Sequence, residues 1–214
     1  MRPRVALALG IALLLLAACS TTRGSGQLAT TQREVSGFTK VELAGQGHLT
    51  IEQTGTESLT ISAEENLLPL LTSDVSGDTL VLGTKPNTSI VTTQPITYSV
   101  TVKDLNGLMV SGSGTINTPK LATTELTTKI SGSGTITVNG AANDQNLEIS
   151  GSGRYQAEGL TSKTVKARIS GSGNATVMAT DVLDVAISGS GSLTYSGNPQ
   201  VKQEISGSGK LIKK

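Results

Sequence analysis

A pentapeptide, Ile-Ser-Gly-Ser-Gly, recurs along the second half of the chain and constrains its fold more than any other feature. It begins at Ile130, Ile149, Ile169, Ile187 and Ile205, and a variant copy, Val-Ser-Gly-Ser-Gly, begins at Val110. Successive copies are separated by 20, 19, 20, 18 and 18 residues. A period of this length is typical of a solenoid, in which every repeat is one structural unit stacked on the next.

The residues around each copy alternate between apolar and polar, which indicates β-strands. The residue before each first serine and the residue two positions earlier point inward, whereas the residue between them is mostly charged and faces water. Beyond the glycines the alternation resumes, with inward positions at Ile116, Ile136, Tyr155, Ala175, Leu193 and Leu211. At about 3.3 Å per residue, one period traces a closed loop of roughly 60 to 66 Å, enough for three short strands and three corners.

These observations predict an all-β chain that folds as a single-stranded parallel β-helix with rungs of 18–20 residues. Rungs stacked about 4.8 Å apart place each residue on its counterpart, so one environment selects one residue in every rung. Glycine suits the corner because it accepts a positive φ and has no Cβ. An antiparallel meander of hairpins is the alternative, but hairpins do not require position-for-position identity between successive units.

Composition excludes several classes of protein. The chain has 214 residues, room for one or two domains, and aromatic residues are 2% of it, so its core must be thin and aliphatic. Lys and Arg number 17 against 16 Asp and Glu. This near-neutral balance lacks the basic stripe of a nucleic-acid-binding protein, and no nucleic-acid partner is expected.

The N-terminus resembles the signal sequence of a bacterial lipoprotein. Two arginines precede an apolar run over residues 5–16, and Leu16-Ala17-Ala18-Cys19 resembles a lipobox. The resemblance implies that residues 1–18 are a signal peptide and that Cys19 carries the acyl chains of a membrane anchor. The residue after the cysteine is Ser20 rather than Asp, which in Gram-negative lipoproteins resembles the signal for transport to the outer membrane. Residues 19–36, which are polar and aperiodic, are expected to be the lipidated cysteine and a flexible tether. An ordinary cleaved secretory signal is the alternative.

Residues 37–214 resemble one protein family through an ordered set of segments. These are "FTKVELAGQGHLTIEQ", "SLTISAEENLLPLL", "SVTVKDLNGLMVSGSG" and the serial "ISGSG" copies, behind the lipobox. Together they resemble the head GIN domain family, described as "putative auto-transporter adhesin". The resemblance implies a secreted, right-handed β-helical domain over residues 37–214, and it supplies no catalytic residue.

The first serines of the six copies are the candidate binding residues. They should stack as a hydroxyl ladder of Ser111, Ser131, Ser150, Ser170, Ser188 and Ser206. The hydroxyls could bond to one another and to corner backbone groups, or they could form a regular array for a sugar or another repetitive ligand. A nucleophilic serine would need a base, and the single histidine, His48, is far in sequence from every repeat and is expected to be an exposed strand residue. No phosphate-binding loop or calcium repeat is present. We therefore expect no catalytic residue, metal or cofactor.

The function favoured is that of a non-enzymatic cell-envelope lipoprotein, held in the outer membrane through Cys19, that binds a glycan or a protein partner. A structural scaffold that associates end to end, as bactofilins do, is the second possibility, and a polysaccharide-acting enzyme is a remote third. Lys210, Lys213 and Lys214 follow the last copy. Like charges at a strand edge oppose pairing, so the domain is expected to be monomeric.

Overall fold

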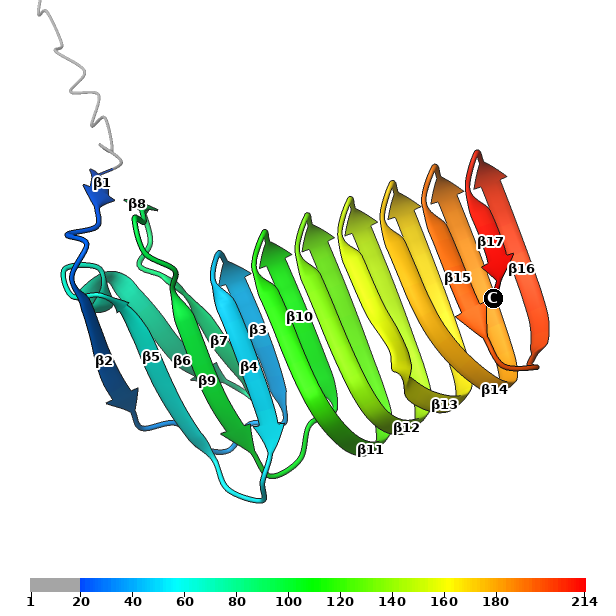
Figure 1. The fold of residues 1–214 in the computed structure, drawn as a ribbon, viewed down its shortest axis with the longest axis horizontal. Helices are drawn as coiled ribbons and strands as arrows, with labels where there is room; N and C mark the ends of the chain where they lie inside the picture. Colours follow the sequence, from blue (N-terminus) through cyan, green and yellow to red (C-terminus); the bar gives the residue numbers. More distant parts are fainter. Residues whose placement is uncertain (1–19) are drawn as a thin grey trace, which may run out of the picture.

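The structure, a computed structural model, describes residues 20–214. The predicted signal peptide and Cys19 lie outside these residues. Between Ser20 and Lys214 the regular structure is β-strand, apart from one 3-10 turn, η1 (Leu68–Leu70). The strands form an N-terminal part and a solenoid that extends from it to the C-terminus (Figure 1). The prediction of an all-β chain is confirmed.

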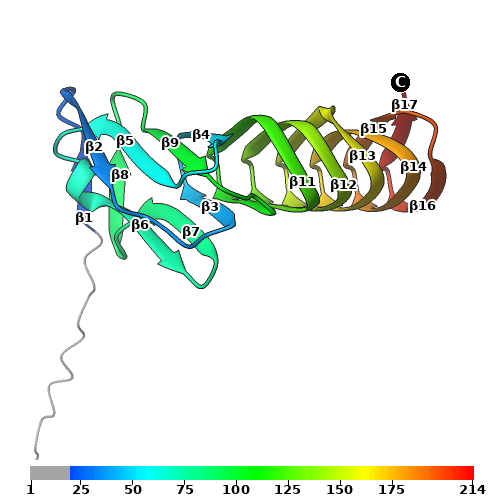
Figure 2. The ribbon, with the colours of Figure 1, turned by 90° about the horizontal axis from the view of Figure 1, so that it is seen from below.

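The solenoid is a stack of parallel strands in which each rung pairs with the next in register. Ser131 lies opposite Ser150, and Ile149 lies opposite Ile169. Figure 2 shows the strands winding as successive coils. The strands are β10 (Gly107–Gly112), β11 (Thr115–Gly132), β12 (Thr135–Gly151), β13 (Arg154–Gly171), β14 (Asn174–Gly189), β15 (Ser192–Ser196), β16 (Gln200–Gly207) and β17 (Lys210–Lys213). The parallel β-helix is confirmed over the meander, and its handedness stays a prediction.

Each rung bends at three corners, as its length predicted. One is the Ser-Gly corner, and the other two interrupt the pairing within the long strands. The register of β13 against β14 shifts between Ala157 and Thr161 and again between Ser162 and Thr164. Each rung therefore has three straight segments. The segments that precede the Ser-Gly corners form one sheet, which we call the ladder face. It consists of β10, residues 125–132 of β11 and their counterparts in β12, β13, β14 and β16.

The core of the solenoid is built from columns of stacked side chains, most of them aliphatic. The apolar residues that precede the first serines are at most 2% exposed from β10 to β14; they are Val110, Ile130, Ile149, Ile169 and Ile187. Burying one such side chain stabilises the fold by about 1.5–3 kcal/mol. Tyr155 is also buried, as predicted, and its hydroxyl donates a hydrogen bond to Gln145 Oε1 at 2.9 Å. Gln145 in turn donates to Ser162 Oγ at 2.6 Å, so this buried polar cluster is internally paired.

The N-terminal part continues the solenoid and then covers its end. The strands β3 (Lys40–Gly45) and β4 (His48–Gln53) form the first rung, because they pair in parallel with β10 and β11. Further strands extend both sheets of this rung, the nearest of them parallel to it and the outer ones antiparallel to their neighbours (Figure 1). On one side, β7 (Thr79–Thr84) pairs with β3 and with β6 (Leu71–Ser76). On the other, β9 (Thr97–Val102) pairs with β4 and with β5 (Ser58–Glu64), which pairs with β2 (Leu28–Arg33).

The prediction of a flexible tether is wrong for residues 20–33, which form two strands. The first, β1 (Ser20–Arg23), pairs in parallel with β8 (Thr88–Val91), and β2 extends the sheet at β5. Arg33 anchors β2 through its guanidinium, which donates to Leu71 O and Leu68 O, both at 2.9 Å. The backbone pairs whatever the side chains are, so a polar edge strand forms without the hydrophobic alternation that identifies strands in a sequence.

The Ser-Gly corner requires glycine for two reasons, as Gly132 and Gly134 show. Gly132 has φ +112°, and a Cβ there would lie 2.7 Å from the carbonyl oxygen of Gly112 in the preceding rung. At Gly134 a Cβ would lie 2.3 Å from Val110 Cγ1. The first glycine therefore provides the positive φ and the close backbone approach, and the second leaves room for the apolar side chain of the preceding rung.

Candidate binding surface

The first serines of the six repeats form one exposed column on the ladder face. The register of the rungs places each serine beside the next. Adjacent members are about 4.8 Å apart, the spacing of neighbouring strands. All six side chains are exposed; they are Ser111, Ser131, Ser150, Ser170, Ser188 and Ser206. We call this column the serine ladder.

The ladder hydroxyls are not consumed by bonds within the protein. Ser111 Oγ donates to Glu42 Oε1 at 2.7 Å. The other five hydroxyls have no side-chain hydrogen bond to any part of the chain between residues 20 and 214. The possibility that the serines bond to one another or to corner backbone is therefore not what the structure shows. These hydroxyls can donate and accept hydrogen bonds outward.

A column of mixed charge runs beside the serine ladder, two residues before each serine. Its members are Met109, Lys129, Glu148, Arg168, Ala186 and Glu204, of which four are charged. Lys129 Nζ lies 3.5 Å from Glu148 Oε2, an exposed pair of the kind that contributes about 0–1 kcal/mol to stability. Arg168 and Glu204 have no ion-pair partner among residues 20–214. Both signs of charge therefore stay accessible next to the hydroxyls.

The two columns border an open depression of about 570 Å³ on the C-terminal half of the ladder face. Its polar lining consists of Ser150, Ser170, Ser188, Ser206, Glu148, Arg168 and Glu204. Every rung from β12 to β16 contributes to it. A ligand here would meet hydroxyls, one guanidinium and two carboxylates, which suits a polar, hydrogen-bonding partner.

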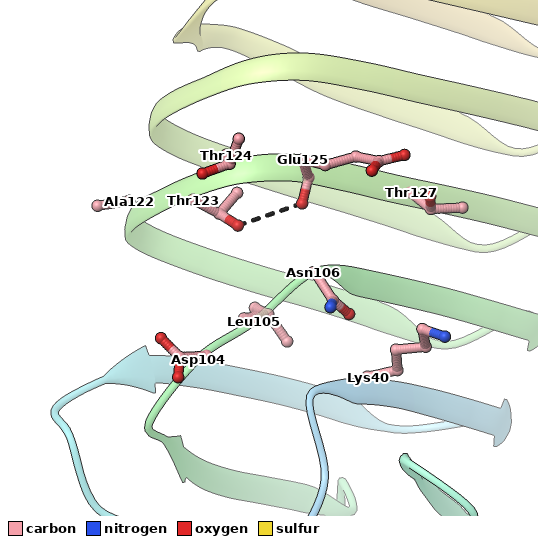
Figure 3. Close-up of a pocket in the computed structure, with 9 residues that line it drawn as sticks. All are labelled: Lys40, Asp104, Leu105, Asn106, Ala122, Thr123, Thr124, Glu125 and Thr127. Atoms are coloured by element: carbon pink, nitrogen blue, oxygen red, sulfur yellow. Dashed lines mark hydrogen bonds between the residues drawn. The ribbon is translucent and has the colours of Figure 1, made fainter.

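A second hollow, of about 560 Å³, lies where the solenoid meets the N-terminal part (Figure 3). It forms because residues 121–125 of β11 pair with β12 alone and have no strand on their other edge. The Gln53 side chain supplies one substitute, accepting a hydrogen bond from Ala122 N at 3.0 Å. The lining residues are Lys40, Asp104, Leu105, Asn106, Ala122, Thr123, Thr124, Glu125 and Thr127. No sequence pattern indicates this hollow, because three separate stretches with no shared motif build it.

Several polar groups of this second hollow already have partners. The Thr123 hydroxyl donates to the carbonyl oxygen of Glu125 at 3.2 Å (Figure 3). The Glu125 carboxylate accepts from Asn146 Nδ2 at 2.9 Å. Lys40 Nζ lies 2.9 Å from Asp78 Oδ2, and this bond lowers the pKa of the Asp78 carboxyl. The hollow is therefore mainly a seam between the two parts, and the serine ladder is the better candidate surface.

No histidine, cysteine or tyrosine of residues 20–214 lines either surface. His48 is the exposed first residue of β4, as predicted. The Tyr155 ring is buried in the core, so it cannot stack on a ligand. Its burial also raises the pKa of the hydroxyl. Among residues 20–214, no three His, Cys, Asp or Glu side chains are grouped so that they could hold a metal ion. What the ladder face offers is hydrogen bonding and charge.

Known proteins share this architecture. The family model described as "putative auto-transporter adhesin, head GIN domain" matches residues 37–199. No functionally curated protein matches the chain. Within residues 20–214, no helix is long and apolar enough to span a membrane.

Three crystal structures of similar fold come from Bacteroides and Parabacteroides species. A putative adhesin from Bacteroides fragilis is 24% identical, with a TM-score of 0.73 over 90% of this chain and 100% of that one. A putative lipid binding protein from Parabacteroides distasonis is 23% identical, with a TM-score of 0.54 over 91% and 100%. A putative adhesin from Parabacteroides merdae is 22% identical, with a TM-score of 0.53 over 91% and 99%. At these identities the likeness concerns the fold.

Proposed function

The chain belongs to the head GIN domain family, described as "putative auto-transporter adhesin", and from this premise we propose that it is a non-enzymatic binding protein of the bacterial cell envelope. Its ligand, a glycan or a protein partner, binds at the ladder face. The observation that carries this proposal is the exposed serine ladder, in which five hydroxyls have no partner in the described part of the chain. The charged column beside it supplies further polar contacts.

A polymer with a repeating polar group suits this surface best. Each rung presents the same hydroxyl at a constant spacing, so a repetitive ligand can make the same contact on several rungs at once. Weak contacts that act together give an avidity well above that of any single contact. Serine hydroxyls donate and accept hydrogen bonds, and so do sugar hydroxyls. Lipid binding, which is said of the Parabacteroides distasonis neighbour, does not suit so polar a face.

Anchoring through Cys19 completes the proposal. The lipobox-like residues 16–19 support acylation of Cys19 and insertion of its lipid chains into the outer membrane. Strand β1 begins at the next residue, Ser20, and pairs at once with β8. The anchor would therefore hold the folded domain close to the bilayer rather than at the end of a long flexible linker.

The test compares two serine columns of the same rungs. The triple variant Ser150→Ala/Ser170→Ala/Ser188→Ala removes ladder hydroxyls, and Ser152→Ala/Ser172→Ala/Ser190→Ala removes exposed hydroxyls from the far side of the same corners. Binding is measured on a glycan array and by pull-down from the bacterium's own envelope. Losing three hydrogen bonds of about 0.5–1.5 kcal/mol each should weaken binding at least tenfold in the ladder variant. The control should stay within about twofold. Equal binding by wild type and ladder variant would contradict the proposal.

A scaffold that grows end to end is less well supported. Head-to-tail growth needs two matching open ends. The N-terminal end instead carries the antiparallel strands β2, β5 and β6, which do not repeat the shape of a rung. At the C-terminal end of residues 20–214, β16 has a free strand edge, which does not match these N-terminal strands.

A further inference from the structure

The last rung exposes the residues that earlier rungs bury. Strand β16 pairs with β14 along one edge, and no other strand of residues 20–214 pairs with it. Val201 and Ile205 are 41% and 38% exposed. Their counterparts one rung earlier, Leu183 and Ile187, are 0% and 2% exposed. An unpaired edge with apolar side chains on its inner face is a template for another strand.

The sequence of β16 is complementary to itself when it is read in the opposite direction. We consider a second copy of β16 placed antiparallel along the free edge, with Gln203 opposite Gln203. Lys202 of each copy then lies opposite Glu204 of the other, and Val201 lies opposite Ile205. Residues directly opposite in an antiparallel pair have side chains on the same face and interact. The apolar pair therefore extends both cores, and the charged pair lies on the ladder face.

The charged side chains of β16 are free enough to make this contact. Lys202 is 82% exposed, and its Nζ lies 4.0 Å from Asp184 Oδ2, at the limit of an ion pair. Glu204 has no ion-pair partner between residues 20 and 214. In a two-fold arrangement the Lys202 to Glu204 contact occurs twice, whereas a parallel pairing in the same register would place like charges together.

The expectation of a monomer rests on Lys210, Lys213 and Lys214, which lie elsewhere on the end of the solenoid. They belong to β17 and the C-terminus, on a different segment of the rung from β16. Lys213 Nζ donates to Asn198 Oδ1 at 2.9 Å, and Lys214 pairs with the Glu158 carboxylate. Two of the three lysine side chains thus contact other residues of the same chain, which weakens the argument that they keep two copies apart.

We propose that two copies of this chain associate tail to tail through antiparallel pairing of their β16 strands, with Gln203 at the two-fold axis. The contact is isologous, so it closes at a dimer. The two ladder faces then join into one surface, because paired strands belong to the same sheet. The proposal does not depend on the ligand of the serine ladder, and either can fail without the other.

A disulfide tests the register directly. In the full chain carrying Gln203→Cys, the two introduced thiols face each other at a Cα separation of about 4.5–5.5 Å, within the range of a disulfide. After mild oxidation, non-reducing electrophoresis should show dimer at least fivefold above Lys163→Cys, an exposed control away from the last rung. The wild-type chain shows what Cys19 alone contributes. A Gln203→Cys yield no higher than these controls would overturn the proposal.

Charge reversal tests the pairing itself. In the Gln203→Cys chain, Lys202→Glu places carboxylates opposite one another, and the dimer yield should fall at least fivefold. Adding Glu204→Lys restores opposite charges and should restore the yield, which a merely misfolded chain would not do. Equal yields in all three chains would overturn the proposal. So would open-ended oligomers of the wild-type chain in sedimentation, because the two-fold contact stops at two.

Discussion

Among residues 20–214, Glu64 is the one carboxylate buried in the fold, and its surroundings favour its charged form. It is 1% exposed at the end of β5, and it accepts hydrogen bonds from Gly26 N at 2.7 Å and from Thr93 N at 2.9 Å. The Thr93 hydroxyl also donates to it at 2.6 Å and is the largest cause of its low pKa. Together with the backbone donors this outweighs desolvation, which acts the other way, and lowers the pKa to about 2. Glu64 thereby ties residues 26 and 93 to β5.

The low pKa of Glu64 predicts a loss of stability in acid. A carboxyl whose folded pKa is below its unfolded value stabilises the fold above the unfolded pKa, here 4.5, and this contribution disappears as pH falls toward about 2. Glu64→Gln should therefore lower the urea midpoint at pH 7 and flatten its dependence on pH between 4.5 and 2. Glu65→Gln, at the exposed neighbour, is the control and should follow the wild type. A Glu64→Gln profile parallel to the wild-type profile would contradict this assignment.

Sequence reasoning placed the inward side chains of the solenoid correctly and left the serines undecided. Alternation identified Tyr155 as a core residue because the repeat gave it five counterparts. The serines lie at the corner, where the strand bends and alternation no longer says which way a small side chain points. Burial of Glu64 could not be foreseen either, since its donors, residues 26 and 93, are distant in sequence.

The rung is a unit whose corner depends on the rung before it. Gly45, in the first rung, has φ +134°, and a Cβ there would meet nothing within 4 Å. Gly151 has φ +117°, but a Cβ there would lie 2.7 Å from Gly132 O. Gly207 in the last rung is similarly crowded, with 2.6 Å to Gly189 O. The first rung should therefore tolerate a side chain at this corner better than the interior rungs do. The last rung should tolerate it no better than the interior rungs.

Alanine at these corners separates backbone strain from crowding. Gly45→Ala should cost about 1–2 kcal/mol, because only the positive φ opposes it. Gly151→Ala and Gly207→Ala should each cost a further 1–3 kcal/mol, roughly, from overpacking. Urea unfolding of the three variants measures the difference. Equal losses at Gly45 and Gly151 would mean that the rungs do not approach as closely as the structure shows.

The repeat predicted the solenoid well and the N-terminal strands less completely. Alternation indicates strands within residues 37–53 and 96–105, but it does not say which strands pair with one another, because pairing between unlike segments leaves no periodic signal. Strand β1 was missed altogether, since its four residues are polar and depend on β8 for their backbone bonds. A sequence thus reveals strands whose environment repeats and conceals those whose partner is unique.

The molecule is a rod with the predicted anchor at one end and the open rung at the other. Strand β1, next to Cys19, lies at the N-terminal end, and β16 lies at the far end of the solenoid (Figure 1). Seven strand-to-strand steps separate β7 from β16, or roughly 34 Å at about 4.8 Å each. An anchored chain would therefore hold its last rung away from the bilayer.

Removing the anchor residue tests the expected location. Cys19→Ala should abolish acylation, so that metabolic labelling with palmitate detects the wild-type chain and not the variant. Without acylation the lipoprotein signal should not be processed, and outer-membrane fractions should lose the protein. Wild-type protein recovered in the soluble periplasm, with no acyl mass on Cys19, would refute the anchor.

The identical corners also have a consequence for how the gene can change. Because every long strand meets the next through the same Ser-Gly step, an in-frame loss of the codons for residues 132–150 joins Ser131 to Gly151 and recreates an unaltered corner. Stability in such stacks is approximately a sum over units and their interfaces, so a shorter or longer stack folds by the same rules. Loss or gain of a segment between two corners can therefore shorten or lengthen the protein by a whole rung, removing or adding one ladder hydroxyl each time.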